Sequence, residues 1–333
     1  MEQIEIGASG LSTSRIGLGT WAIGGWMWGG SDERESIRTI HAALDKGINF
    51  IDTAPVYGFG ISEETVGKAI EERGSREKVF IATKVGLEWR DGSITRNSSP
   101  ARIRQEVQDS LRRLRTGYID IYQVHWPDPA VPIEETARTR QELQKEGLIR
   151  AIGVSNYSPK QMGEFLSVSE LHAVQPPYNL FERQSESDVL PYAREKNLGA
   201  LAYGPLCRGL LTGRMQPGTK FAGDDLRKSD PKFQAPRYAQ YLKAVRQLDD
   251  LAQKRYGKRV MDLAARWVLD QPGISAALWG ARHPAQLEAV TGALDWKLDA
   301  DALAAIDQIL QETINDPVGP EFMAPPAKNA VAA

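Results

Sequence analysis

Cysteine, histidine and long apolar runs are all scarce in this sequence, and each scarcity excludes a class of protein. The single cysteine among 333 residues, Cys207, rules out an internal disulfide and fits a reducing compartment. We interpret it as a buried packing residue, with a reactive thiol as the alternative. No segment approaches the ~18 consecutive apolar residues of a membrane-spanning helix, and the opening MEQIEIGASG lacks the apolar stretch of a secretory signal. The sequence therefore predicts a cytoplasmic protein without a membrane span.

An excess of charge of one sign is also missing. The chain has 41 Lys and Arg against 43 Asp and Glu, and no basic run that would favour a nucleic acid. Its four histidines, His41, His125, His172 and His283, contain no pair at the spacing of a zinc site, and no cysteine cluster would complete one. A Gly-x-Ser-x-Gly sequence is absent as well. We therefore predict no metal site and do not expect a serine hydrolase.

What the sequence does contain is a regular alternation of short apolar runs with longer amphipathic segments. Residues 1–15 are expected to form a β-hairpin that leads into a first strand. Helices are predicted from apolar spacing and from start signals such as a Ser62 cap and Pro100. The expected strands are 48–54, 79–86, 119–126, 149–156, 172–180, 200–206 and 275–282, and the expected helices are 31–47, 62–74, 99–117, 133–147, 159–168, 188–199, 241–257, 260–273 and 284–294.

This alternation predicts an α/β fold with a parallel sheet, since each crossover connection needs a dozen or more residues. Eight strand–helix units after the hairpin match the closed (β/α)₈ TIM barrel, whose usual size is about 250 residues. An open doubly wound sheet is the competing arrangement. No linker rich in Pro, Gly or Ser divides the chain. Residues 1–333 are thus predicted to form a single domain with an irregular C-terminal tail at 311–333.

Four polar residues stand at the ends of the predicted strands: Asp52, Tyr57, Lys84 and His125. In a closed barrel the strand ends meet at one face, so these side chains would lie together. A lysine ammonium beside a tyrosine would stabilise phenolate and lower the tyrosine pKa from its usual value of about 10. The aspartate would hold the ammonium, and the histidine would orient a substrate oxygen. The set suits transfer of a proton to a carbonyl oxygen as hydride reaches the carbon.

Each of these residues alone has a simpler interpretation. Asp52 would cap a turn, and Tyr57 would be a half-buried aromatic. Lys84 would be paired at a strand end, where a charge is tolerated, and His125 would be a core imidazole. Taken together as four strand-end residues of one barrel, they favour function over these alternatives.

Residues 17–22, GLGTWA, have the form G-x-G-x-x-A of a dinucleotide-binding motif, but their context argues against one. A true motif of this kind opens a helix at once, whereas a Gly/Trp-rich loop, IGGWMWGG, follows here. We expect Trp21, Trp26 and Trp28 to form flat apolar walls of a pocket, with core packing as the alternative for one or two of them. Trp126 is expected in the same pocket.

The second half of the chain offers better cofactor candidates. Ser155, Asn156 and Gln175 suit hydrogen bonds to a carboxamide, and Tyr203 suits stacking on a flat ring. Arg282 precedes the helix predicted at 284–294, so its guanidinium and free backbone N–H groups would make a phosphate site. An ordinary surface arginine is the alternative.

Several motifs together resemble the aldo-keto reductases, and the resemblance covers essentially the whole chain. The segments that carry it are GINFIDTAPVYG, IATKVG, DIYQVHWPD, IRAIGVSNYS, QPPYNL, LAYGPLCRGLLTG and LWGARHPAQLEA. The tail NDPVGPEFMAPP and the segment ALWGAR look most like the bacterial branch that includes general-stress and inositol-operon reductases.

The resemblance implies a (β/α)₈ barrel that binds NADPH in an extended form, with Tyr57 as general acid/base of the tetrad Asp52, Tyr57, Lys84 and His125. It places Ser155, Asn156 and Gln175 on the nicotinamide amide and Tyr203 against its ring. Leu206, Gly209 and Leu210 would lie over the pyrophosphate, with Arg282 and Gln286 near the adenosine 2′-phosphate and ribose. The full predicted cofactor-binding set is Thr20, Trp21, Asp52, Ser155, Asn156, Gln175, Tyr203, Gly204, Leu206, Gly209, Leu210, Gly280, Arg282 and Gln286, and the predicted substrate pocket is Trp21, Trp26, Trp28, Tyr57, His125 and Trp126.

One departure from the family pattern affects the adenine end of the cofactor. Many relatives carry Glu-Asn late in the helix after the phosphate site, where this chain has Ala289 and Val290. Adenine would then be held differently or more loosely. Arg282 still favours NADPH over NADH, because a 2′-phosphate would be its charged partner.

Two functions are compatible with these observations. The first is reversible NADPH/NADP+-dependent reduction of small aldehydes or ketones, such as glyceraldehyde, methylglyoxal or sugars, to alcohols or polyols. The chain would then be an aldehyde reductase or alcohol dehydrogenase whose partner is a small molecule. The second is an NADPH-binding regulatory subunit similar to potassium-channel β subunits, against which the short segment before the first strand argues. The natural substrate, the physiological direction and the oligomeric state stay open, and a monomer is possible.

Overall fold

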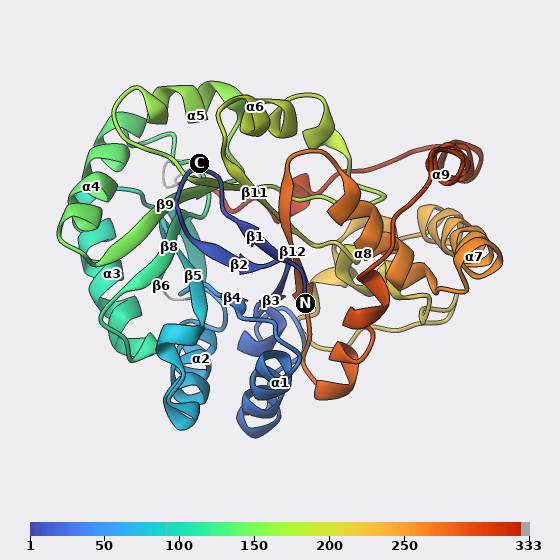
Figure 1. The fold of residues 1–333 in the computed structure, drawn as a ribbon, viewed down its shortest axis with the longest axis horizontal. Helices are drawn as coiled ribbons and strands as arrows, with labels where there is room; N and C mark the ends of the chain where they lie inside the picture. The colour runs from blue at the N-terminus through green and yellow to red at the C-terminus, as the bar shows by residue number, and fades with distance from the viewer. Residues whose placement is uncertain (91, 328–333) are drawn as a thin grey trace.

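The computed structural model describes residues 1–90 and 92–327, so the last six residues of the predicted tail lie outside the described residues. Within them, eight parallel strands close into a barrel surrounded by helices, as Figure 1 shows. The open doubly wound sheet is thereby excluded. In barrel order the strands are β3 (Ile16–Gly19), β4 (Phe50–Asp52), β5 (Phe80–Val85), β8 (Ile119–Val124), β9 (Ile149–Ser155), β10 (Ala173–Gln175), β11 (Gly199–Tyr203) and β12 (Ile274–Gly280).

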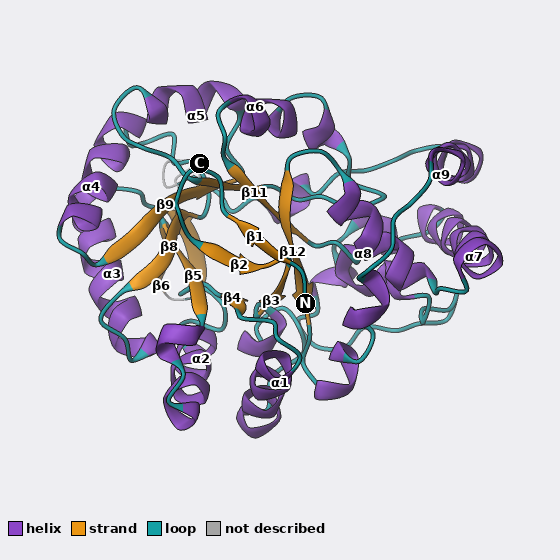
Figure 2. Ribbon diagram, viewed as in Figure 1, coloured by secondary structure: helices purple, strands orange, loops and turns teal. Residues whose placement is uncertain are grey.

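The helices alternate with these strands around the outside of the barrel (Figure 2). Their starts follow the local signals: Asp32 caps the first helix, Ser99 precedes Pro100 at the start of the third, and Ser158 forms a capping box with Gln161. Their bounds are α1 (Glu33–Asp45), α2 (Ile61–Arg73), α3 (Pro100–Leu114), α4 (Ile133–Lys145), α5 (Pro159–Leu166), α6 (Val189–Glu195), α7 (Arg237–Tyr256), α8 (Val260–Asp270) and α9 (Ala300–Thr313).

The predicted cap at Ser62 is wrong. Helix α2 begins one residue earlier, after Gly60, whose φ of 103° is open to glycine at little cost. The Ser62 hydroxyl is buried instead, where it lies 2.7 Å from Thr20 Oγ1 and 2.9 Å from Thr53 Oγ1. These bonds tie the start of α2 to the loops after β3 and β4.

The helix predicted at 284–294 is also wrong. The segment forms two short 3₁₀ turns, η7 (Pro284–Leu287) and η8 (Val290–Ala293). A carbonyl oxygen that a continuous α-helix would use accepts an indole N–H group instead, because Trp279 Nε1 donates to Gln286 O at 3.2 Å. Trp296 Nε1 donates to Gly292 O at 2.8 Å, in the last turn of the expected helix. The tertiary contacts of the two tryptophans therefore override the local helical pattern.

Other parts of the structure lie beyond the predicted elements. A hairpin formed by β6 (Leu87–Arg90) and β7 (Ser93–Arg96) follows β5, and α9 extends to Thr313 inside the segment expected to be irregular. The rest of the tail, up to 327, is irregular as predicted, apart from the turn η9 (Glu321–Met323). Hairpin and tail meet, because Arg96 forms a β-bridge with Ala327.

The N-terminal hairpin, β1 (Gln3–Glu5) with β2 (Ser12–Ser14), closes the end of the barrel opposite the strand carboxyl ends. Figure 1 shows it crossing the middle of the barrel. Ile6 packs into the apolar barrel interior with Phe50 and Leu201. A Cβ on Gly7 would lie 2.6 Å from His172 O, at the start of β10, so only glycine fits there. With one end plugged, the other end is left to form the site.

Among the helices of the described residues, none combines the length and the apolar character needed to cross a bilayer.

Candidate active site

The strand carboxyl ends bring the four predicted polar residues together. Asp52 ends β4, Lys84 lies in β5, His125 follows β8, and Tyr57 lies in the turn before α2. Lys84 Nζ donates to Asp52 Oδ1 at 2.6 Å and to the Tyr57 hydroxyl oxygen at 3.2 Å. The Tyr57 and His125 rings meet edge to face, with centroids 5.7 Å apart. Because lysine can only donate, the Tyr57 hydroxyl hydrogen remains available for a ligand.

Burial shifts the pKa values of three members of this tetrad, Tyr57, Lys84 and His125. It raises the pKa of Tyr57 well above its usual value near 10, and the Asp52 carboxylate adds to the rise. The expectation that Lys84 lowers the tyrosine pKa is therefore wrong for this site, since burial and the Asp52 carboxylate both raise it. Burial also lowers the pKa of Lys84, against the opposing pull of Asp52. For His125, burial and then Lys84 lower the pKa well below its usual value of about 6.5, which keeps the imidazole neutral.

Asp52 is held from its other side by two glutamines. Its Oδ2 accepts from Gln175 Nε2 at 2.7 Å and from Gln123 Nε2 at 3.2 Å. The sequence analysis missed Gln123, although a polar residue inside the apolar strand IDIYQVH is a signal that could have found it. Together with Lys84, the two glutamines give the Asp52 carboxylate three side-chain donors.

The other predicted carboxamide-binding residues form a chain of hydrogen bonds beside the tetrad. Asn156 Nδ2 donates to His125 O at 2.9 Å, and the Tyr203 hydroxyl donates to Asn156 Oδ1 at 3.0 Å. Ser155 Oγ donates to the Gln175 backbone oxygen at 2.8 Å. Asn156 has a φ of 59°, a conformation that asparagine tolerates better than most residues. These hydrogen bonds fix the side chains of Ser155, Asn156 and Tyr203 at the mouth of the barrel.

Two cavities share this floor. The first has a volume of about 100 Å³ and mostly apolar walls. Of the predicted substrate-pocket residues, it contains all except Trp28. Its lining residues are Trp21, Trp26, Met27, Val56, Tyr57, Leu87, Ile94, His125, Trp126, Ser155, Asn156, Gln175, Tyr203, Met323 and Pro325.

The second cavity is a cleft of about 320 Å³ that runs from the tetrad to Arg282. Trp28 lies here, together with most of the predicted cofactor-binding residues. Those that line it are Thr20, Trp21, Asp52, Tyr203, Gly204, Leu206, Gly209, Gly280, Arg282 and Gln286, whereas Ser155, Asn156 and Gln175 line the first cavity. Leu210 is fully buried and lines neither of these two cavities, and Ala289 and Val290 are buried outside them as well.

The chemistry of this cleft fits a nicotinamide dinucleotide. Two buried indole donors on its walls, Trp21 Nε1 and Trp28 Nε1, find no hydrogen-bond partner among the described residues. Buried donors usually have a hydrogen-bond partner, and a ligand oxygen in the cleft would supply one. Tyr203 lines both cavities and has a flat face for a ring, and Arg282 supplies positive charge at the far end.

The predicted phosphate site at Arg282 differs from the expectation. The backbone N–H groups of Arg282 and His283 donate to Gln286 Oε1, at 2.7 and 3.3 Å, so they are not free. The Arg282 guanidinium donates to Trp28 O at 2.7 Å and to Gly30 O at 2.6 Å. An anion could therefore interact with the positive charge of the Arg282 guanidinium, which lies beside the loop containing Trp28 and Gly30.

Two loops meet beside the cleft. The Asp224 carboxylate accepts from Met27 N at 2.7 Å and from Gly29 N at 3.1 Å, and Leu226 N donates to Met27 O at 3.0 Å. Arg227 lies over the Trp28 ring, with its Cζ 5.3 Å from the ring centroid. These contacts join the loop after β3 to the long connection after β11, and both line the cleft.

In residues 1–90 and 92–327, no group of three or more His, Cys, Asp or Glu side chains gathers as a metal site requires.

The chain is similar to a family of known enzymes. Residues 15–311 match the aldo/keto reductase family. The aldo-keto reductase YhdN of Bacillus subtilis is 60% identical over 331 residues, which cover 99% of this chain and 100% of that protein. The NADH-specific methylglyoxal reductase of Escherichia coli is 38% identical over 318 residues, covering 91% and 96%.

Two solved structures share the fold and much of the sequence. The glycerol dehydrogenase AKR11B4 from Gluconobacter oxydans superposes with a TM-score of 0.88 at 54% identity, covering 97% of this chain and 99% of that chain. The aldo-keto reductase AKR11C1 from Bacillus halodurans superposes with a TM-score of 0.79 at 30% identity, covering 93% and 96%.

Proposed function

The chain belongs to the aldo/keto reductase family, and we propose that it reduces small aldehydes and ketones to alcohols, reversibly, with NADPH as cofactor and Tyr57 as general acid/base. The observation that carries this proposal is the contact of Lys84 with both Asp52 and Tyr57 at the junction of an apolar cavity and a long cleft. The cofactor supplies the hydride that adds to the carbonyl carbon.

The protein supplies the proton and the orientation. A carbonyl oxygen beside Tyr57 receives the phenolic hydrogen as the carbon–oxygen double bond opens, which leaves a phenolate next to Lys84 Nζ. The ammonium stabilises that phenolate, and Asp52 holds the ammonium at 2.6 Å. Neutral His125 offers one N–H donor to the same substrate oxygen. In the reverse direction the phenolate takes the proton back from an alcohol.

The substrate class follows from the first cavity and from the relatives. Its volume of about 100 Å³ suits a small molecule, and its polar groups lie at the floor. One relative is named a methylglyoxal reductase and another a glycerol dehydrogenase, and both names denote short carbonyl or polyol compounds. We infer substrates similar to glyceraldehyde or methylglyoxal, and sugars.

Arg282 supports NADPH over NADH. A 2′-phosphate would give its guanidinium a charged partner, which is a stronger acceptor than the carbonyl oxygens of Trp28 and Gly30 that it now contacts. The Escherichia coli relative is named NADH-specific, so the cofactor choice needs its own measurement.

The test of the proposed chemistry is the substitution Tyr57→Phe. It removes the transferred hydrogen and keeps the ring, so we expect kcat for methylglyoxal and glyceraldehyde to fall by about 10²–10⁴-fold. Binding of NADPH, followed by quenching of tryptophan fluorescence, should change by less than threefold, or roughly 0.65 kcal/mol. Carbonyl reduction at the wild-type rate by Tyr57→Phe would exclude the proposed role.

A further inference from the structure

The tail crosses between the two cavities at Met323. This half-buried side chain lines the first cavity with Trp126 and also the second cleft with Leu206. Since the first cavity is the proposed carbonyl pocket and the second the proposed cofactor cleft, Met323 is a wall common to both. Its side chain takes up space at the boundary between the two cavities.

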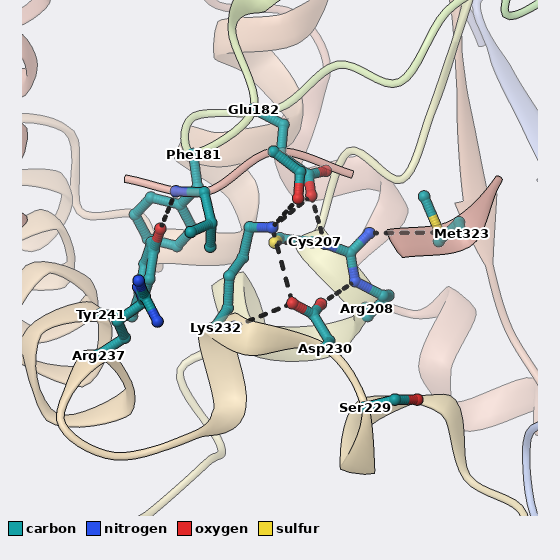
Figure 3. Close-up of polar contacts among 12 residues, drawn as sticks. Phe181, Glu182, Cys207, Arg208, Ser229, Asp230, Lys232, Arg237, Tyr241 and Met323 are labelled. Carbon is teal, nitrogen blue, oxygen red and sulfur yellow. Dashed lines mark hydrogen bonds and ion pairs between the residues drawn. The ribbon is translucent and has the colours of Figure 1, made fainter. Parts of the chain in front are cut away.

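A buried ionic cluster lies behind this wall. It consists of Glu182, Arg208, Asp230 and Lys232, two carboxylates and two cations, each less than a tenth exposed (Figure 3). Arg208 Nε pairs with Asp230 Oδ2 at 2.6 Å, and Arg208 Nη2 also pairs with Glu182. Lys232 Nζ pairs with Glu182 Oε1 at 2.7 Å. Buried pairs of this kind are a weak source of stability, since desolvation offsets much of the attraction, but they do require one arrangement of their segments.

Two cations of the cluster hold the tail directly. Lys232 Nζ donates to Gly319 O at 3.0 Å. Arg208 Nη1 lies 3.9 Å from Met323 Sδ, and the Arg208 guanidinium carbon lies 5.5 Å from the Phe322 ring centroid. Figure 3 shows Met323 on the side of Arg208 that faces away from Lys232. Arg208 also lines the cofactor cleft, so one side chain touches the cleft, the cluster and the tail.

The other end of the tail is held by the hairpin after β5. Arg96 Nε donates to Pro325 O at 2.9 Å, and Arg96 N donates to Pro326 O at 3.2 Å. The Arg96 guanidinium also lies over the Trp126 ring at 5.4 Å. Met323 therefore lies between two anchoring points, Arg208 on one side and Arg96 on the other.

We propose that Met323 is a specificity-determining residue of the carbonyl pocket and that Arg208, fixed by the buried cluster, is the positioning residue that holds it there. The inference rests on the proposed function, because it assigns the first cavity to the carbonyl substrate. It names a size filter: with Met323 in place the pocket favours small carbonyls, and with Met323 displaced it opens toward the cleft and accepts bulkier ones.

The experiment compares Met323→Ala with Arg208→Lys. Arg208→Lys keeps a positive charge between Glu182 and Asp230, so the cluster is not left with an unpaired carboxylate, but it loses the contact with Met323. The measured quantity is the ratio of kcat/KM for benzaldehyde to kcat/KM for methylglyoxal, in which a change of cofactor affinity common to both substrates cancels. Met323→Ala should raise this ratio about tenfold, and Arg208→Lys should raise it in the same direction by a smaller factor.

A double variant separates positioning from a general structural effect. If Arg208 acts through Met323, adding Arg208→Lys to Met323→Ala should leave the ratio of the single Met323→Ala variant unchanged. Arg183→Lys is the matched control, since Arg183 also pairs with two carboxylates, on Glu186 and Asp307, and both of these lie outside the tail 319–327. Additive effects of the two substitutions, or an unchanged ratio in Arg208→Lys, would overturn the proposal.

Hydrogen exchange of the tail gives a readout that needs no activity. Met323 N donates to Pro320 O at 3.0 Å in the turn η9, so amides of residues 319–327 should exchange faster in Arg208→Lys than in the wild type or in Arg183→Lys. If the wild type reduces no carbonyl, the proposed function is wrong, and the exchange data still decide whether Arg208 holds the tail. Equal exchange in all three proteins would show that it does not.

Discussion

The floor and the walls of this site are built in different ways. The floor consists of the tetrad Asp52, Tyr57, Lys84 and His125 at the carboxyl ends of the strands. It is deeply buried, with Asp52 3% and Lys84 1% exposed. The walls consist of the loops 22–31 and 214–230 and the tail 319–327. They are joined by contacts between residues far apart in the chain, such as Asp224 with Met27, 197 residues away, and Arg96 with Pro325, 229 residues away. The difference suggests that the floor determines the chemistry and the walls determine what binds.

The largest effect beyond that of Tyr57→Phe is expected for Lys84→Met, which breaks the floor at its centre. The ammonium that faces the phenolate is lost, so kcat for carbonyl reduction should fall by about 10²–10⁴-fold. Asp52 is left buried and unpaired, which should lower the free energy of unfolding by roughly 3–5 kcal/mol. Steady-state kinetics and urea unfolding measure the two effects.

The double variant Asp52→Asn with Lys84→Met separates them. It removes both charges, so stability should recover relative to Lys84→Met while activity stays lost. Recovery of activity together with stability would mean that Lys84 is only structural, and the division between floor and walls would lose its basis.

The second prediction for the floor concerns how the rates of carbonyl reduction and alcohol oxidation depend on pH. Because the pKa of Tyr57 lies well above 10, the phenol stays protonated through the neutral range, and because the pKa of His125 lies well below 6.5, the imidazole stays neutral there. Carbonyl reduction uses the protonated phenol, so its kcat/KM should be flat between about pH 7 and pH 9. Alcohol oxidation uses the phenolate, so its rate should rise about tenfold per pH unit over the same range.

Initial rates in both directions check this profile. A reduction rate that falls through a midpoint near pH 6.5 as the pH rises would indicate that His125 acts as a protonated acid, contrary to its buried environment. An oxidation rate that levels off below pH 9 would indicate a tyrosine pKa lowered by Lys84, as the sequence alone suggested.

The floor could be predicted from the sequence because its information is local. Asp52 ends an apolar strand, Lys84 lies near the end of another, and His125 follows a third. The closed barrel then brings these strand ends to one face whatever the loops do. The pKa of Tyr57 could not be predicted in the same way. The competing effects of burial and of Lys84 depend on how completely the surrounding loops exclude water, and no local pattern reports that.

The walls escaped prediction because their contacts are long-range. Trp28 was expected in the substrate pocket and lies in the second cleft, beside Arg227. The helix expected after β12 is replaced by 3₁₀ turns, and two carbonyl oxygens of this segment accept tryptophan indole N–H groups. The hairpin β6–β7 and the bridge from Arg96 to the tail have no signal in a single sequence. Tertiary contacts outweighed local propensity in each case.

On the walls, the largest effect is expected at Arg282. Arg282→Gln removes the charge proposed to pair with a 2′-phosphate, so kcat/KM for NADPH should fall by about tenfold to a hundredfold relative to NADH, as for loss of one charge-assisted contact. Arg255→Gln is the control, because Arg255 pairs with Asp299 and Asp301 away from the cleft. Assays with both cofactors at saturating aldehyde measure the change. Equal loss with both cofactors would assign Arg282 to holding the loop at Trp28 and Gly30 instead.

The smallest effect is expected for Asp224→Asn, which weakens the link between the two wall loops without touching the floor. The Asp224 carboxylate accepts charge-assisted bonds from both Met27 N and Gly29 N. Asparagine keeps one acceptor oxygen and no charge, so one of these two bonds should persist in weaker form and the other should be lost. Cofactor should then dissociate about two- to fivefold faster, a change of roughly 0.4–1 kcal/mol, measured by stopped-flow fluorescence.

Asp316→Asn is the control, since Asp316 pairs with Arg237 on the surface. If release of cofactor limits turnover, kcat should rise with the faster release. A fall of kcat as deep as that of Lys84→Met, with unchanged cofactor release, would show that this wall takes part in the chemistry.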